Sequence, residues 1–241
     1  MPSTFAATGG VNELFVDALR YPIRDRTQLD GTAKCLVCLL LAGILLRIAS
    51  RIWPDWAFLG PLVLAIVPAV GFFGLVGGVL SGAGFPDLLT RSTATFAWRL
   101  LAVSAVYLLL PVLAIVATGY VIGSGAVPAA IGGITAATLS TVALLLTIVC
   151  SYLLPAAAVT GIEEGVRAGL RREALRGTAS GAYFLAWVGA MVLVVLSWSV
   201  VATVAARSLV AVVALAWFSY AHVAAAALLA EGVERTRYWQ R

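Results

Sequence analysis

The longest uncharged stretch of this chain decides its fold; it runs from Leu100 to Ile162 and reads LLAVSAVYLLLPVLAIVATGYVIGSGAVPAAIGGITAATLSTVALLLTIVCSYLLPAAAVTGI. A helix of about 20 apolar residues crosses the hydrocarbon core of a bilayer, so this stretch is far too long for one crossing. Gly123-Ser124-Gly125 and Pro128 supply a break within it. The stretch therefore predicts two transmembrane helices, Leu100–Ile122 and Ile131–Leu154.

The composition of the whole chain agrees with a membrane protein. Of its 241 residues, 62% are hydrophobic and only 11% are charged, and the mean hydropathy is +1.02. Soluble domains carry about 25% charged residues. We expect an all-α polytopic membrane protein, a six-helix bundle, with a cytoplasmic N-terminal segment containing an amphipathic helix (1–30), a transmembrane domain (31–230) and a basic cytoplasmic tail (231–241).

Three further spans follow from apolar runs of sufficient length, at Ala57–Leu80, Ala182–Ala205 and Ser208–Ala230. The last two are separated at Arg207, the only charge between them, because one helix over 182–230 would be about 70 Å long.

The first span, Ala33–Ser50, is the shortest. Its charge-free part, Cys35–Leu46, is brief for a crossing, but Lys34 and Arg47 can extend their charged ends toward the headgroups. A re-entrant or tilted interfacial segment is the alternative.

Three segments have the pattern of short helices lying at the membrane surface. Apolar residues recur at helical spacing from Val11 to Leu19, and Ile162, Val166 and Leu170 form a second stripe. Pro86-Asp87-Leu88-Leu89 is a candidate start for a third. The alternative is that these segments extend the spans into the cytoplasm.

The basic residues predict the orientation, because positive charge is concentrated in cytoplasmic loops. With six spans, the face opposite both termini receives only Arg47, Arg51 and Arg207. The other face receives Arg20, Arg24, Arg26, Lys34, Arg91, Arg99, Arg167, Arg171, Arg172, Arg176, Arg235, Arg237 and Arg241. This bias predicts a cell-membrane protein with both termini cytoplasmic.

Short sequence similarities suggest three copies of a helical hairpin. Similar tripeptides stand near the start of odd-numbered spans, and Gly-Val pairs stand near the end of even-numbered ones. The tripeptides begin at Gly31, Ser92 and Gly177, and the pairs at Gly78, Gly165 and Gly232. Chance matches among common small residues are the alternative.

Few residues are candidates for chemistry. His222 is the only histidine and lies inside the sixth span, where an ionisable group is a functional candidate. Cys35, Cys38 and Cys150 lack the partners of a zinc or redox motif, so we expect buried apolar thiols. We expect no catalytic residue, metal or cofactor, and no enzyme activity, because no nucleophile–base pair or metal set is visible.

Helix-breaking and small residues supply the other candidates. Prolines within spans free a backbone carbonyl, kink the helix and can frame a transport site or serve packing. Glycines on one span allow close helix approach or self-association. The prolines are Pro68, Pro111 and Pro155, with Tyr107 and Tyr152 preceding two of them, and the glycines are Gly71, Gly74, Gly77 and Gly78.

The expected partners are membrane lipids, a second membrane protein or another copy of the chain. The basic residues lie at helix ends, where they report affinity for anionic headgroups rather than for nucleic acid. The expected headgroup contacts are Arg167, Arg171, Arg172 and Arg176.

Four motifs resemble an uncharacterised family of multi-pass membrane proteins of haloarchaea and relatives, called "domain of unknown function 4013". They are Asp17-Ala18-Leu19-Arg20-Tyr21-Pro22, Gly84-Phe85-Pro86-Asp87, the segment from Tyr107 to Pro111, and Tyr152-Leu153-Leu154-Pro155-Ala156-Ala157. Val70-Gly71-Phe72 departs from the Gly-Tyr pair expected there. The resemblance implies an archaeal membrane protein over about residues 15–235. The family has no established activity or catalytic residues, so the resemblance assigns none to this chain.

Three functions remain after these observations. The first is a non-enzymatic accessory or membrane-organising subunit that uses small-residue faces and a basic cytoplasmic surface. The second is a transporter or permease-like protein for a small or lipidic solute, and an intramembrane enzyme is third. A polar cavity shared by the prolines and His222 would favour transport, and a dry bundle with an exposed small-residue groove would favour association.

Overall fold

Six long helices form the body of the computed structural model, which describes residues 11–124, 129–176, 178–204 and 209–238. Each of the six is long and apolar enough to cross a membrane, and the described residues contain no strand. The predicted all-α, six-helix fold is therefore confirmed. The six are α2 (Arg26–Ile52), α3 (Leu59–Leu80), α4 (Arg91–Gly123), α5 (Ala129–Glu164), α7 (Gly181–Thr203) and α8 (Leu209–Tyr238).

Short helices complete the described chain. The N-terminal α1 has a buried apolar side, formed by Leu14 and Ala18, and exposed acidic residues opposite. This side packs against α7 and α8, so the predicted amphipathic helix exists and its apolar face is covered by protein. The short helices are α1 (Val11–Arg20), η1 (Tyr21–Ile23), η2 (Trp56–Phe58), α6 (Val166–Gly169) and η3 (Arg172–Leu175).

Polar caps fix where three of the long helices begin. The carboxylate of Asp25 accepts from the backbone N–H groups of Thr27 and Gln28, at 2.8 and 3.0 Å. Such a cap satisfies donors that have no partner within the helix. Because of it, α2 begins well before the predicted span, and the first helix is long enough to cross. Thr90 and Ser180 cap α4 and α7 in the same way.

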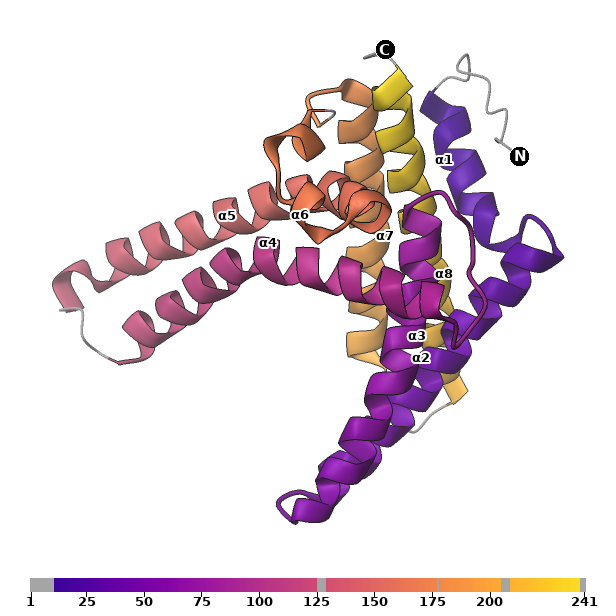
Figure 1. The fold of residues 1–241 in the computed structure, drawn as a ribbon. Helices are drawn as coiled ribbons and strands as arrows, with labels where there is room; N and C mark the ends of the chain where they lie inside the picture. Colours follow the sequence, from indigo (N-terminus) through magenta and orange to yellow (C-terminus); the bar gives the residue numbers. More distant parts are fainter. Residues whose placement is uncertain (1–10, 125–128, 177, 205–208, 239–241) are drawn as a thin grey trace.

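The long helices pair in chain order as three hairpins, α2–α3, α4–α5 and α7–α8. Figure 1 shows the hairpins diverging from a common end, which we call the base. It comprises α1, the loop 81–90, the segments 165–176 and 178–180, and the last turns of α8. The α4–α5 hairpin extends furthest from the other two. The ends of the hairpins away from the base are called the tips.

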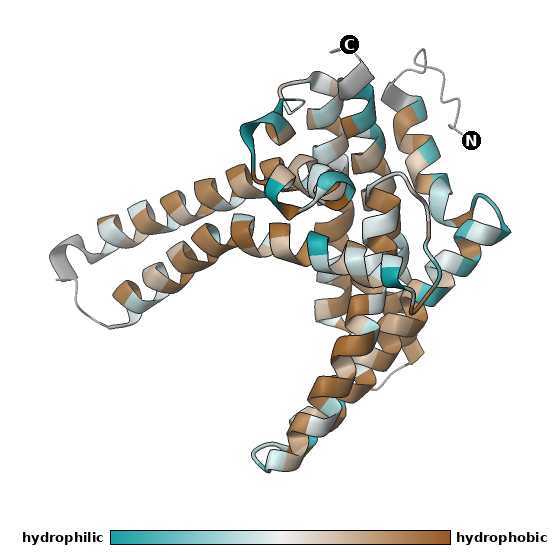
Figure 2. Ribbon diagram, viewed as in Figure 1, coloured by the Kyte–Doolittle hydropathy of each residue, from teal (hydrophilic) through white to brown (hydrophobic). Residues whose placement is uncertain are grey.

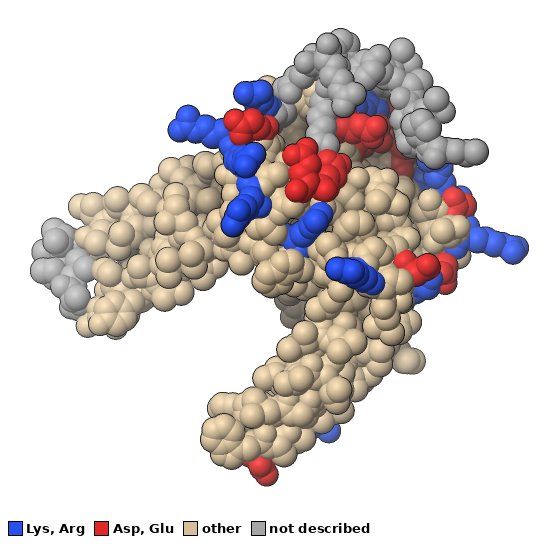
Figure 3. Space-filling view, viewed as in Figure 1, with Lys and Arg blue, Asp and Glu red and all other residues tan. Residues whose placement is uncertain are grey.

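Charge and hydropathy divide the molecule along the same line. Charged side chains gather over the base, whereas the part of the α4–α5 hairpin that extends beyond the base shows none on its visible surface (Figure 3). The hairpins are apolar along most of their length (Figure 2). Arg47, Arg51 and Asp55 lie at or near the α2–α3 tip. This division is the one that the charge bias of the sequence predicted.

One of the predicted surface helices does not form, and a second is interrupted. Residues 84–87 have no regular secondary structure and Leu89 has a positive φ of 62°, so the helix predicted from Pro86 is wrong. Gly165, with φ 110°, ends α5 and separates Ile162 from the short α6. The predicted stripe of Ile162, Val166 and Leu170 is therefore interrupted, with Ile162 buried and Leu170 exposed.

The sequence repeat does not occupy equivalent positions in the three hairpins. Gly31 lies inside α2, whereas Ser92 lies in the first turn of α4. Gly78 lies near the end of α3, Gly165 at a helix break and Gly232 inside α8. The hairpins are thus similar in arrangement, and the repeat in sequence stays a prediction. Gly125, Pro128, Gly177 and Arg207, on which parts of the sequence argument rest, lie outside the described residues.

Candidate functional site

The break at Pro155 is closed by side chains of α7. Proline has no N–H, so the carbonyl of Ser151 one turn earlier loses its donor within α5. The indole Nε1 of Trp187 donates to this carbonyl at 3.0 Å. The hydroxyl of Tyr183 donates to the neighbouring carbonyl of Tyr152 at 2.6 Å. The predicted kink site is therefore a hydrogen-bonded joint between α5 and α7.

Tyr152 strengthens this joint. Its hydroxyl donates to the carbonyl of Thr178, which precedes α7. Its ring meets Tyr183 and Trp187 edge to face, with 5.2 Å between centroids in both pairs, an arrangement that aromatic rings prefer. The segment from Tyr152 to Pro155 thus fixes the α4–α5 hairpin to the α7–α8 hairpin. The hydroxyl of Tyr152 and the carbonyls of Ser151 and Tyr152 all take part in contacts between α5 and the α7 region, so packing accounts for them.

The other prolines lie in different surroundings. Pro111 is fully buried in α4, and the hydroxyl of Tyr107, one turn earlier, donates to the carbonyl of Gly169 at 3.5 Å. Pro68 is half-buried in α3. Neither of the two cavities described in the structure is lined by a proline named above or by His222. Neither of these two cavities is therefore the polar cavity, shared by the prolines and His222, that would favour transport.

His222 lies in an aromatic cluster. Its ring stacks on Phe218 with centroids 4.0 Å apart, and it meets Phe72 at 6.1 Å. Nδ1 lies 2.8 Å from the carbonyl of Phe218; as a donor there, Nδ1 carries the proton. Cys35 and Cys38 are buried in the same part of the core, as predicted, whereas Cys150 is only half-buried. Within the described residues no group of three metal-ligating side chains is present.

The glycines of α3 are used inside the molecule. A methyl group on Gly74 would overlap Thr93 of α4, and one on Gly78 would lie 2.5 Å from the carbonyl oxygen of Gly84. On Gly71 it would lie 3.0 Å from the sulfur of Cys38 in α2. These three positions let α2, α4 and the loop 81–90 approach α3 closely. Their face is therefore already occupied and is not available for self-association.

The loop 81–90 packs against a glycine of α2 as well as against Gly78 of α3. Phe85 contacts the position where Gly31 lacks a side chain, and its ring lies 6.2 Å from that of Tyr21. Burial raises the pKa of the Tyr21 phenol, and the nearby carboxylate of Asp25 adds to the shift. The hydroxyl of Thr93 donates to the carbonyl of Asp87 at 2.6 Å. The motif Gly84-Phe85-Pro86-Asp87 is thus a wedge at the base.

Arg99 has a structural function that the sequence did not indicate. Its Nη1 donates to the carbonyl of Ile162 at 2.6 Å and lies 3.4 Å from that of Glu163. The last carbonyls of a helix have no partner within it and carry partial negative charge. Arg99 therefore caps the end of α5 from α4. The only sequence feature that could have indicated this contact is the presence of an arginine in the first turns of an apolar helix.

The predicted headgroup contacts form an exposed basic edge of the base. Arg167 belongs to α6, Arg172 belongs to η3, and Arg171 and Arg176 flank η3. All four are exposed. Because α6 is a single short turn, the basic edge is a folded loop rather than one face of a long helix. Glu173 interrupts the run of positive charge.

The α4–α5 hairpin has an open surface of small and apolar residues. Ile134 is 72% exposed and Leu109 58%. A methyl group on Gly119 or Gly133 would meet nothing within 4 Å. The small residues continue along α5 as GITAATLST, 133–141, so the exposed small-residue face lies on this hairpin and not on α3.

The family model described as "Protein of unknown function (DUF4013)" matches residues 91–210. This match supports membership of the chain in that family, as the motifs predicted. It covers the α4–α5 hairpin, the joint at Pro155, the basic edge and α7; the motifs at 17–22 and 84–87 lie outside it. No curated protein and no solved structure matches the chain.

Proposed function

We propose that this chain is a non-enzymatic accessory or membrane-organising subunit, which associates laterally with another membrane protein through its α4–α5 hairpin. The proposal places it in the cell membrane of an archaeon, with both termini cytoplasmic and the basic edge against anionic headgroups. The observation that carries it is the open face of α4 and α5. The same hairpin lies within the residues that match the family model.

Helices associate in lipid for other reasons than in water. Burying apolar surface gives no driving force in lipid, because lipid tails are as apolar as leucine. Association depends on close packing and on hydrogen bonds, which small residues such as Gly, Ala, Ser and Thr permit. Such residues lie on the exposed side of α5, for example at Gly133, Ala137 and Ser140. The space beside Gly71, Gly74 and Gly78 of α3, in contrast, is already filled by neighbours within the chain.

The anchoring of the hairpin supports the same function. The α4–α5 pair is joined to α7 through Trp187 and Tyr183, and to α3 through Gly74. These contacts lie toward the base, whereas the residues beyond them are exposed. A hairpin that is held firmly at one end and uncovered along its length offers a rigid surface to a partner.

The test compares two substitutions that add the same side chain at open glycines. Gly133→Leu fills the small-residue face of α5, and Gly60→Leu adds the same bulk to α3, where a side chain also meets nothing within 4 Å. Each variant is expressed with an affinity tag in native membranes and purified in mild detergent. Co-purifying proteins are quantified by mass spectrometry, and self-association is measured with a differently tagged second copy.

We expect one or a few membrane proteins, or the second copy, to be recovered with the wild type. Their recovery falls severalfold with Gly133→Leu and is unchanged with Gly60→Leu. Equal recovery with both variants, or a wild-type chain that is recovered alone as a monomer, contradicts the proposal.

A further inference from the structure

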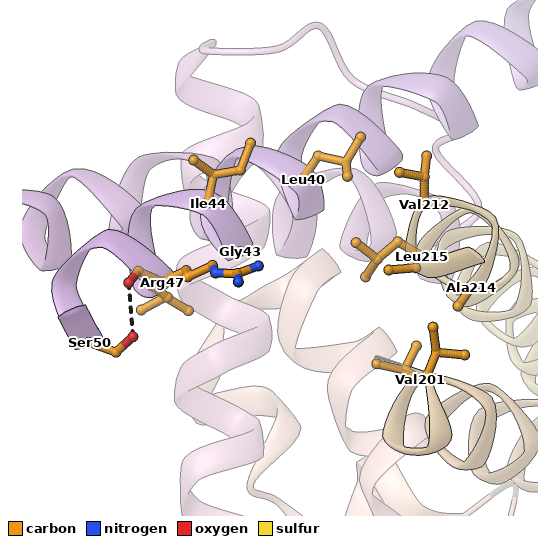
Figure 4. Close-up of a pocket in the computed structure, with 12 residues that line it drawn as sticks. Leu40, Gly43, Ile44, Arg47, Ser50, Val201, Val212, Ala214 and Leu215 are labelled. Carbon is orange, nitrogen blue, oxygen red and sulfur yellow. Dashed lines mark hydrogen bonds between the residues drawn. The ribbon is translucent and has the colours of Figure 1, made fainter. Parts of the chain in front are cut away.

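A cavity of about 760 Å³ lies between α2 and the facing tip ends of α7 and α8. Ligand sites in proteins commonly enclose about 300–1,000 Å³, so the volume is that of a binding site. Figure 4 shows α2 on one side and Val201, Ala214 and Leu215 on the other. The lining is aliphatic apart from Arg47 and Ser50, both from α2.

Arg47 gives this apolar groove one positive charge. Its side chain is half-buried and extends from α2 into the space toward Leu215 (Figure 4). The guanidinium group matches phosphate oxygens with two parallel N–H donors. A groove with one cation in an aliphatic wall is complementary to a ligand with an anionic head and an apolar tail.

The position of the groove fits the depth of a lipid molecule. Arg47 stands five residues before the end of α2, and the exposed Trp53 and Trp56 follow at the tip. Tryptophan is enriched at the headgroup level, so Arg47 lies near that level. Leu40 stands two turns further into the membrane, about 10 Å along the helix. The aliphatic wall between Arg47 and Leu40 therefore runs into the membrane, parallel to the hydrocarbon chains of the lipids.

We propose that this groove binds an anionic phospholipid of the surrounding bilayer, with its phosphate held by Arg47 and one hydrocarbon chain lying along Leu40 and Ile44. The site is at the opposite end of the molecule from the basic edge formed by Arg167 and Arg172, and it does not depend on the proposed function. A soluble anion would leave the aliphatic wall without an apolar partner, and an uncharged apolar solute would leave Arg47 without an anionic one.

Two variants test the two halves of the ligand separately. Arg47→Gln removes the charge and keeps much of the side chain. Gly43→Phe places a ring in the cavity, because Gly43 lines it and a side chain there meets nothing within 4 Å. Arg51→Gln is the matched control, an exposed arginine one turn further along α2 that does not line the cavity.

The full-length chain is purified in uncharged detergent and titrated with fluorescent phosphatidylglycerol, and separately with phosphatidylcholine. Excess inorganic phosphate is added in a third series. Size-exclusion chromatography and circular dichroism check that each variant is folded. If Arg47→Gln does not fold, Gly43→Phe still tests the site.

We expect Arg47→Gln to weaken phosphatidylglycerol binding about tenfold, since a hydrogen bond to a charged group contributes at least that factor. Gly43→Phe reduces binding of the same lipid, Arg51→Gln leaves it unchanged, and phosphate does not displace it. Equal losses in Arg47→Gln and Arg51→Gln overturn the site. Equal affinity for phosphatidylcholine, or displacement by phosphate alone, overturns the assignment to an anionic lipid.

Discussion

The joint between α5 and α7 makes a quantitative prediction for Trp187→Phe. The substitution keeps an aromatic ring beside Tyr152 but removes the N–H that donates to the carbonyl of Ser151. Leaving a buried carbonyl unsatisfied costs about 1–3 kcal/mol, whereas hydrogen bonds between membrane helices average about 0.6 and reach about 1.7 kcal/mol. We expect the free energy of unfolding to fall by about 1–1.5 kcal/mol.

A second substitution separates the hydrogen bond from the loss of ring volume. In Pro155→Ala, residue 155 regains an N–H, which can bond to the carbonyl of Ser151 within α5. Trp187→Phe should then cost about 1 kcal/mol less than it does in the wild type. The difference between the two costs is the coupling energy of a double-mutant cycle.

The assay is denaturant unfolding in mixed detergent micelles, followed by circular dichroism, for the wild type, both single variants and the double variant. Trp98→Phe is the matched control, because Trp98 is 69% exposed and its replacement should change stability little. A coupling energy below about 0.3 kcal/mol, within the usual error of additivity, refutes the argument that Trp187 satisfies the carbonyl freed by Pro155.

Three further substitutions test other contacts by the same unfolding measurement. Gly74→Ala should lower the free energy of unfolding by about 2–3 kcal/mol, because the added methyl group overlaps the side chain and backbone of Thr93. Arg99→Gln should lower it by about 1 kcal/mol, since the charged donor to the carbonyl of Ile162 is lost at a partly exposed position. His222→Phe should change it by less than about 1 kcal/mol, because the ring contacts of His222 are aromatic and its polar contact is within its own helix.

Each of the three has a control or an outcome that contradicts it. Gly119→Ala adds the same methyl group at an open position and should be neutral; a loss equal to that of Gly74→Ala shows that crowding is not the cause. An unchanged stability of Arg99→Gln removes its assignment as the cap of α5. A His222→Phe variant that is stable but loses partner recovery would show that the histidine acts in function rather than in packing.

The architecture followed from the sequence because it depends on coarse properties. The uncharged run from Leu100 to Ile162 is too long for one crossing whatever its details, and the structure forms α4 and α5 from it. The first helix is longer than its charge-free stretch, Cys35–Leu46, indicates. Asp25 caps α2 at its start, so the helix begins before the apolar stretch, and the first turns of α2 are polar.

Side-chain partners between helices were not predictable from one sequence. Spacing placed Pro155 in a helix, but it gave no means of identifying Trp187, on another hairpin, as the donor to the freed carbonyl. The glycines of α3 indicated close approach without showing whether the neighbour was within the chain. Pro86 resembled a helix start because proline is favoured in a first turn, yet the loop there instead wedges Phe85 against Gly31.

The central claim is that all three hairpins cross the membrane from one cytoplasmic base. Single cysteines at the tips (Asp55→Cys, Ser124→Cys or Thr203→Cys) and at the base (Arg172→Cys) test it, each in a chain whose native cysteines are replaced by alanine. Intact cells are treated with a membrane-impermeant maleimide before and after permeabilisation. We predict that all three tips are labelled in intact cells and that residue 172 is labelled only after permeabilisation; a tip that behaves like residue 172 would contradict the account.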